Sequence, residues 1–291
     1  MAQALEVLSQ RLLELDRLAE ASPYLREAGE IFFQLGDSEE QIRILTSIAY
    51  VYERCGLDAA AALAAWEQVE ALRSGQGNMS GELEALEGMA RVARNQQQDP
   101  TAALEYLDRA LHVAERMGDA AKQGDLLNTM GIIEWGRLNY PNALGYYQKA
   151  LKVFETLGDV VHAGLMLNSI GVTLHNLGRT DEAAAHLRHA LQFHRRSGQR
   201  LLEGHALAAL GDICDGATSL DQAREYYAAS LEIRQEIGDR KGEGWMSHHL
   251  ARVLFLQGGE EQALPLLNQA TAIAVETGDQ QLGAACARLQ T

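Results

Sequence analysis

The sequence predicts an all-α fold, an α-α superhelix of seven helix-turn-helix repeats followed by a C-terminal half repeat. A marker dipeptide, Gly-Asp or a close variant, recurs every 40 or 41 residues, small residues recur at fixed places between the markers, and the apolar residues between them follow helical spacing. The markers are Gly36-Asp37, Gly77-Asn78, Gly118-Asp119, Gly158-Asp159, Gly198-Gln199, Gly238-Asp239 and Gly278-Asp279. They divide residues 1–291, taken as a single solenoid domain, into repeats at approximately 1–36, 37–77, 78–118, 119–158, 159–198, 199–238 and 239–278, with a partial repeat at 279–291.

The first helix of each repeat, helix A, is expected to begin at the marker, because glycine ends the preceding helix in the left-handed conformation and aspartate caps the next one. Helix A then carries a small-residue ladder: Ser9, Ala49, Ala90, Gly131, Gly171, Gly211 and Ala251. Small residues at facing positions allow two helices to approach closely.

The second helix, helix B, is expected to follow a short turn such as Asp99-Pro100 or Tyr140-Pro141, since proline is accepted in a first helical turn. Helix B carries two further ladders. One is Ala21, Ala62, Ala103, Ala143, Ala183, Ala223 and Ala263, and the other is Ala28, Val69, Ala110, Ala150, Ala190, Ser230 and Ala270.

Composition narrows the function classes. The chain is 47% hydrophobic and 22% charged, which is typical of a folded globular protein. No apolar run exceeds eight residues and the N-terminus lacks a secretory signature, so we expect a cytoplasmic protein without a membrane span. The formal charge of −15 opposes direct nucleic-acid binding. The spacing of Cys55, Cys214 and Cys286 predicts free thiols.

The fifth repeat reads Leu167-x-x-Ile170-Gly171 in helix A, followed by Ala183, Leu187 and Ala190 in helix B. These residues resemble the tetratricopeptide repeat (TPR). The 40-residue period is most similar to the Pins/LGN variety and to the helical sensor domains of MalT-type bacterial regulators. The resemblance covers the whole chain and implies a TPR solenoid that binds proteins or peptides. The chain departs from the pattern at Leu138, which replaces an inner-turn glycine, and at Glu134, which replaces a large apolar residue.

The resemblance also implies that helix A lines a concave groove, with exposed positions six and three residues before the small-residue ladder and one and four residues after it. This spacing places the four positions on one helical face. The candidate protein- or peptide-binding residues at these positions are Arg91, Arg94, Asn128, Trp135, Asn168, His175, His205, Asp212, Trp245, His248 and Arg252. Their mixture of aromatic, amide and charged groups fits a peptide groove. The plainer interpretation is that these are ordinary exposed positions, with the tryptophans partly packed on neighbouring helices.

Catalytic motifs are absent from the sequence, so we expect neither an enzyme nor a bound cofactor. His186, His189 and His194 lie close together in the sequence, but the face that His186 and His189 share belongs to helix B, where the alternation with arginines indicates a solvated convex surface and not a metal site. Convergence of His175, His205, Asp212, Asp215 and His248 was a minor alternative. The basic stretch His194, Arg195, Arg196 and Arg200 fits a helix C-terminus, with a docking patch as the other interpretation.

Two functions from different classes follow. The first is a non-catalytic scaffold that binds a protein or peptide segment in the groove. The second is a ligand-sensing regulatory domain of a larger bacterial transcriptional or signalling protein. Apolar residues at both ends, from Leu5 to Leu13 and from Leu282 to Leu289, also predict either a homodimer through the terminal repeats or continuation into further domains.

Overall fold

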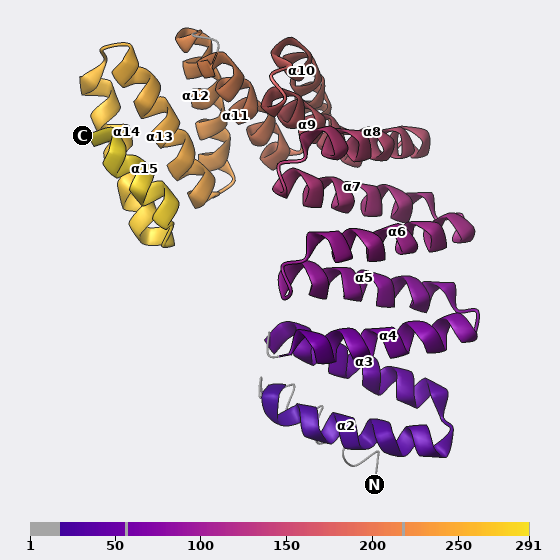
Figure 1. The fold of residues 1–291 in the computed structure, drawn as a ribbon. Coiled ribbons are helices and arrows are strands. Elements are labelled where there is room, and N and C mark those ends of the chain that lie inside the picture. Colours follow the sequence, from indigo (N-terminus) through magenta and orange to yellow (C-terminus); the bar gives the residue numbers. More distant parts are fainter. Residues whose placement is uncertain (1–17, 56–57, 217–218, 291) are drawn as a thin grey trace. The chain divides into compact units, whose positions relative to one another are not determined.

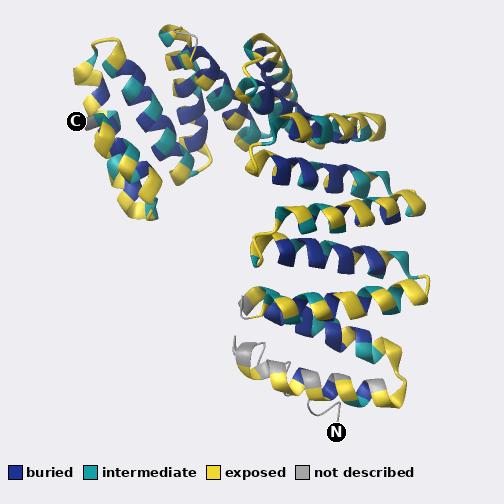
Figure 2. Ribbon diagram, in the orientation of Figure 1, coloured by how far each residue is buried: buried dark blue, intermediate teal, exposed yellow. Residues whose placement is uncertain are grey.

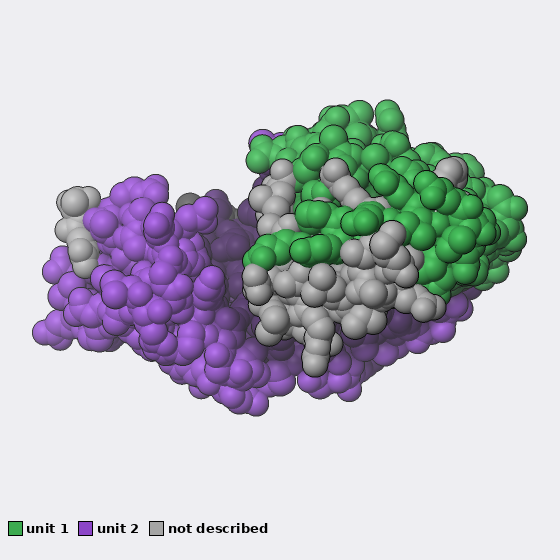
Figure 3. Space-filling view, turned by 90° about the horizontal axis from the view of Figure 1, so that it is seen from below, with its two compact units in different colours: residues 1–137 green, residues 138–291 purple. Residues whose placement is uncertain are grey.

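The computed structural model describes residues 18–55, 58–216 and 219–290, and these residues form fourteen α-helices and no strand (Figure 1). The all-α prediction is confirmed. The ladder residue Ser9 and the N-terminal apolar residues from Leu5 to Leu13 lie outside the described residues. Cα packing divides the chain into two compact units, 1–137 and 138–291 (Figure 3), and each is described here by itself.

The first unit contains helices α2 to α7, and each of them packs on the next helix along the chain. Their bounds are α2 Leu18–Leu35, α3 Ser38–Cys55, α4 Ala59–Gly75, α5 Met79–Asn95, α6 Pro100–Met117 and α7 Ala120–Gly136. Helices α3, α5 and α7 are helix A of the second, third and fourth repeats, and α2, α4 and α6 are helix B of the first three.

The second unit contains α8 to α15, again with each helix packed on the next. The bounds are α8 Tyr140–Leu157, α9 Val160–Asn176, α10 Thr180–Ser197, α11 Arg200–Gly216, α12 Leu220–Glu236, α13 Arg240–Leu256, α14 Glu260–Thr277 and α15 Gln280–Gln290. Helix α15 is the predicted half repeat, and it buries Leu282 and Cys286.

The markers end and begin helices as predicted. Gly118 and Gly158 cap α6 and α8 in the left-handed conformation, with φ of 69° and 70°. The next residue then caps helix A: the Asp159 carboxylate accepts a hydrogen bond from the His162 backbone N–H at 3.1 Å. At the inner turn of the fourth repeat Leu138 adopts φ of 61°, whereas Gly178 has 75° at the equivalent place. Leu138 therefore carries backbone strain that a glycine would avoid.

The ladders account for the helix packing. Every described helix B ladder side chain from Ala62 to Ala270 is buried, and Figure 2 shows buried segments that recur along the helices between less buried ones. A Cβ atom added to Gly171 would lie 2.6 Å from Leu187 Cγ, and one added to Gly211 would lie 2.5 Å from Tyr227 Cε1. Glycine at these two positions therefore sets how closely helix A approaches helix B of its own repeat.

Helix A is the more buried helix of the pair: in the third repeat, α5 buries nine residues and α6 buries five. Helix α5 contacts both α4 and α6, and α13 contacts both α12 and α14. Even Glu134, the charged departure from the repeat pattern, is only 4% exposed, with its carboxylate 3.5 Å from the Arg137 guanidinium. Most of the candidate residues lie on the face of helix A that these neighbours leave half-buried or exposed.

Candidate functional site

The helix A face of the first unit holds an ion pair between consecutive repeats. The Arg91 guanidinium on α5 donates to Glu53 on α3 at 2.8 Å and lies over the Tyr50 ring at 5.8 Å. The Tyr50 hydroxyl donates in turn to Glu84 at 3.1 Å, and burial together with the Glu84 charge raises the pKa of Tyr50. Arg91, a predicted binding residue, is thus half-buried and already paired with a carboxylate.

A cleft of about 220 Å³ lies beside Arg91, between the helix A faces of α5 and α7. It is lined by Glu87, Ala90, Arg91, Arg94, Leu107, Leu126, Thr129 and Ile133. The Glu87 carboxylate accepts from Lys122 Nζ at 3.2 Å, which offsets its negative charge. Arg94 is exposed and donates to the neighbouring Asn95 at 3.0 Å. The structure therefore places two predicted residues, Arg91 and Arg94, at one small cleft with an apolar base.

The helix A face of the second unit repeats the same type of ion pair. Arg252 on α13 pairs with Asp215 on α11, and the buried Tyr227 hydroxyl donates to Asp212 at 2.7 Å. Burial raises the pKa of Tyr227, so its hydroxyl remains a donor at neutral pH. Of the predicted residues here, Arg252 is half-buried and Asp212 is exposed.

Aromatic side chains gather on α13 beside this ion pair. The Trp245 ring lies 6.0 Å from both His248 and His249, and His249 stacks on Tyr227 at 5.1 Å. The Trp245 indole N–H donates to Asp279 at 3.2 Å, and His248 is only 8% exposed. The partly packed interpretation of Trp245 is therefore the better one, and His248 belongs to the interior more than to an open groove.

Two predicted residues on α9 present unsatisfied polar atoms. Asn168 Oδ1 and His175 Nδ1 are buried and have no hydrogen-bond partner among the described residues. Leaving a buried acceptor unpaired costs free energy, and such an atom calls for an explanation. Asn168 and His175 are seven residues apart, two helical turns, so they share one face of α9.

The remaining predicted residues differ in exposure. Asn128 on α7 is half-buried, Trp135 is 38% exposed, and His205 on α11 is exposed. Among the described residues no three His, Cys, Asp or Glu side chains are placed to hold a metal ion. The minor alternative, a site formed by His175, His205, Asp212, Asp215 and His248, is therefore wrong.

The basic stretch at the end of α10 is not a free docking patch. His194 is fully buried against Gly164, so it is not an exposed member of the stretch. Arg195 donates to Glu203 at 2.9 Å, and Arg200 pairs with both Glu203 and Glu236. The stretch holds α10, α11 and α12 together.

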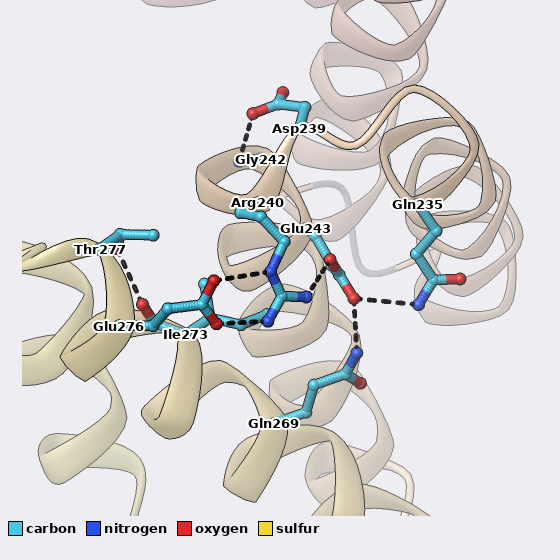
Figure 4. Close-up of polar contacts among 9 residues, drawn as sticks. All are labelled: Gln235, Asp239, Arg240, Gly242, Glu243, Gln269, Ile273, Glu276 and Thr277. Carbon is cyan, nitrogen blue, oxygen red and sulfur yellow. Dashed lines mark hydrogen bonds and ion pairs between the residues drawn. The ribbon is translucent and has the colours of Figure 1, made fainter.

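Two buried glutamates near the start of helix A, Glu203 and Glu243, were not predicted from the sequence. Glu203 is 5% exposed and Glu243 is 6% exposed, and both stand in the pattern Arg-x-x-Glu-Gly at the start of helix A. In Figure 4 the Glu243 carboxylate accepts from Arg240 at 2.6 Å, Gln269 at 2.7 Å and Gln235 at 3.3 Å. The repetition of this pattern forty residues apart is the signal that could have identified it.

The buried histidines predict a pH dependence of stability. Burial lowers the pKa of His194, His248 and His249, whereas histidines of the unfolded chain titrate near about 6.5. Between these values the unfolded chain binds more protons, so the free energy of unfolding should fall as the pH drops from about 7 to about 5. The free energy of unfolding, measured with urea at several pH values in this range, should depend less steeply on pH for His194→Gln than for the exposed control His189→Gln. Equal slopes would contradict the expectation.

In the part of the chain that the structure describes, none of the helices is both long and apolar enough to cross a bilayer. A search of the curated proteins found no match to this sequence. A family model described as tetratricopeptide repeat matches residues 81–156, 162–236 and 217–274.

Solved structures share the fold at low sequence identity. The chain is 18% identical, with a TM-score of 0.72, to a signal transduction ATPase with numerous domains from Pyrococcus horikoshii that has a tetratricopeptide repeat sensor, covering 98% of this chain and 44% of that one. It is 16% identical, with a TM-score of 0.63, to the Rap conjugation gene regulator of plasmid pLS20 in complex with the Phr* peptide, covering 98% and 78%. It is 17% identical, with a TM-score of 0.64, to the quorum sensor NprR of B. thuringiensis, covering 98% and 79%.

Proposed function

Because this chain belongs to the tetratricopeptide repeat family, we propose that it is a non-catalytic scaffold that binds a protein or peptide segment along the helix A face. The observation that carries the proposal is the pair of unsatisfied polar atoms on α9, Asn168 Oδ1 and His175 Nδ1. Rotation of the half-buried Asn168 and His175 side chains would bring these atoms to the backbone amides of an extended peptide, which would remove the cost of leaving them unpaired. The peptide complex of the structurally similar Rap regulator supports this choice of ligand.

We assign the main-chain contacts to Asn128 and Asn168, since an amide side chain both donates and accepts. Acidic side chains of the ligand would meet arginines of the same face. Arg91 and Arg252 reach a ligand while still paired with Glu53 and Asp215, whereas Arg94 offers its charge directly. The ligand is a protein segment and not nucleic acid, in keeping with the net charge of −15, and the site of action is the cytoplasm.

A sensing domain of a larger bacterial regulator is the second candidate. It is favoured by the Pyrococcus horikoshii protein, whose repeat is a sensor and of which this chain spans 44%. The two candidates share the binding face, and they differ in whether ligand binding changes a second, attached activity. Measuring that activity with and without ligand in the full-length protein distinguishes them.

The binding face is tested with peptides selected by the full chain from a phage-displayed random library. Asn128→Ala combined with Asn168→Ala should weaken a selected peptide about tenfold in fluorescence anisotropy, because each lost main-chain hydrogen bond contributes roughly 0.5–1.5 kcal/mol. The matched control is Arg188→Ala combined with Arg196→Ala, two exposed residues of α10. Selection of no peptide, or weakening by the control pair alone, would show that the proposed face is wrong.

A further inference from the structure

Two pairs of consecutive repeats place an ion pair at equivalent positions of the helix A face. In the first unit Glu53, four residues after the ladder residue of its repeat, pairs with Arg91, one residue after the ladder residue of the next repeat. In the second unit Asp215 and Arg252 occupy the same two positions and form the same pair. The fold thus places these two positions of consecutive repeats within ion-pair distance of each other.

The third and fourth repeats lack this ion pair. The third repeat carries the cation Arg94 at the position of Glu53 and Asp215, and the fourth carries the apolar Ile132, which is 49% exposed, at the position of Arg91 and Arg252. The side chain of Arg94 is exposed, and its guanidinium donates a hydrogen bond to the side-chain amide of the adjacent Asn95 at 3.0 Å. Its charge is therefore not used to join the two repeats.

The cleft beside Arg94 has the size and lining for one side chain. Its volume of about 220 Å³ is below the roughly 300–1,000 Å³ of pockets for drug-sized ligands and above the roughly 150 Å³ of a cavity that holds benzene. Leu107, Leu126 and Ile133 contribute an apolar base. An aliphatic side chain fits such a cleft better than a polar one, because the base offers it no hydrogen bonds.

The charges around the cleft indicate which ligand residue would lie next to the aliphatic side chain. Arg94 stands at the edge of the cleft, and the Glu87 carboxylate that also lines it is paired with Lys122 at 3.2 Å. A single carboxylate on the ligand would gain a charge-assisted hydrogen bond to Arg94. A tract of acidic residues would instead be repelled by a chain of net charge −15.

We propose that the cleft between α5 and α7 recognises an aliphatic side chain of a peptide that carries one aspartate or glutamate within two residues of it, with the carboxylate bound by Arg94. This deepens the proposed function and rests on it. The ligand is a peptide segment of mixed acidic and aliphatic character, and Arg94 sets its charge preference.

The same peptide selection tests this proposal through the sequences recovered. The enriched peptides should share an acidic residue next to, or one residue away from, Leu, Ile or Val. Arg94→Glu should weaken such a peptide by about 30-fold or more, because the substitution replaces a charge-assisted hydrogen bond by the repulsion of two carboxylates. Arg116→Glu on α6, exposed and outside the cleft lining, is the matched control and should bind as the unchanged chain does.

A charge exchange gives the sharpest result. Replacing the acidic residue of the peptide by lysine should abolish binding to the unchanged chain and restore it to the Arg94→Glu chain. Arg94→Gln, which removes the charge without reversing it, replaces Arg94→Glu if the latter alters the circular dichroism spectrum. Peptides that depend on Asn128 and Asn168 but lack an acidic residue, or that ignore Arg94, would overturn this proposal and leave the proposed function intact. Recovery of no peptide at all would overturn both.

Discussion

Gly171→Leu is expected to lower the free energy of unfolding by about 3 kcal/mol, at the upper end of what overpacking a core costs. The Cβ atom alone would lie 2.6 Å from Leu187 Cγ and 3.2 Å from the Ala183 carbonyl oxygen, and the carbonyl is backbone that cannot rotate away. Leu187 is fully buried, so α9 and α10 must separate to admit the new side chain. Urea unfolding followed by far-ultraviolet circular dichroism measures the loss.

Gly145→Ala on α8 is the control for this substitution. An added Cβ at Gly145 meets no atom within 4 Å, and a helix-interior alanine is more stable than glycine by roughly 0.5–1 kcal/mol. The control should therefore unfold at a higher urea concentration than the unchanged chain, and Gly171→Leu at a lower one. If both substitutions stabilise the chain, the close approach at Gly171 does not set the spacing of α9 and α10.

The fold could be predicted because successive repeats carry small residues at the same positions. A glycine facing a bulky residue is uninformative once, but Gly171 and Gly211 stand forty residues apart and each lies against helix B of its own repeat. The same periodicity placed the helix ends, because Gly118 and Gly158 adopt the left-handed conformation that ends a helix. Repetition thus replaced the homologous sequences that such a prediction usually needs.

The burial of His194 could not be predicted from its own helix alone. On α10 the residue stands among arginines, which suggests a solvated face. At forty-residue intervals, however, the same column holds Phe154, Arg234 and Ala274, and all of these are buried. A column of the repeat, and not the charge of the neighbours in sequence, decides which side of helix B a residue occupies.

The positions of the candidate site followed from the repeat, but the partners of its residues did not. Whether Arg91 meets a ligand or Glu53 depends on the distance between consecutive helices A and on side-chain rotamers, neither of which the periodicity specifies. The sequence shows that Arg94 occupies the position at which two other repeats carry Glu53 and Asp215. That difference matters only because the structure pairs Glu53 and Asp215 with arginines of the next repeat.

Glu243→Ala is expected to cost about 1–3 kcal/mol, although it removes a charged residue of the kind usually found at the surface. The Glu243 side chain is only 7% exposed, and its carboxylate accepts from the amides of Gln269 on α14 and Gln235 on α12 as well as from Arg240 (Figure 4). Alanine would leave the half-buried Gln269 amide without its acceptor, a loss that costs roughly 1–3 kcal/mol, whereas the exposed Gln235 amide can donate to water instead. The network joins α12, α13 and α14, so the loss should appear as a lower urea midpoint of the second unit.

Glu276→Ala separates this effect from the loss of a surface ion pair. Glu276 binds the same guanidinium, at 3.1 Å and 2.6 Å, but its side chain is 53% exposed and water replaces it readily. Its removal should shift the midpoint far less than Glu243→Ala does, and added salt should shrink the difference between the Glu276→Ala and unchanged chains. Comparable losses for the two variants would mean that Glu243 stabilises the chain through Arg240, the partner that both glutamates share, and not through the amides of Gln235 and Gln269.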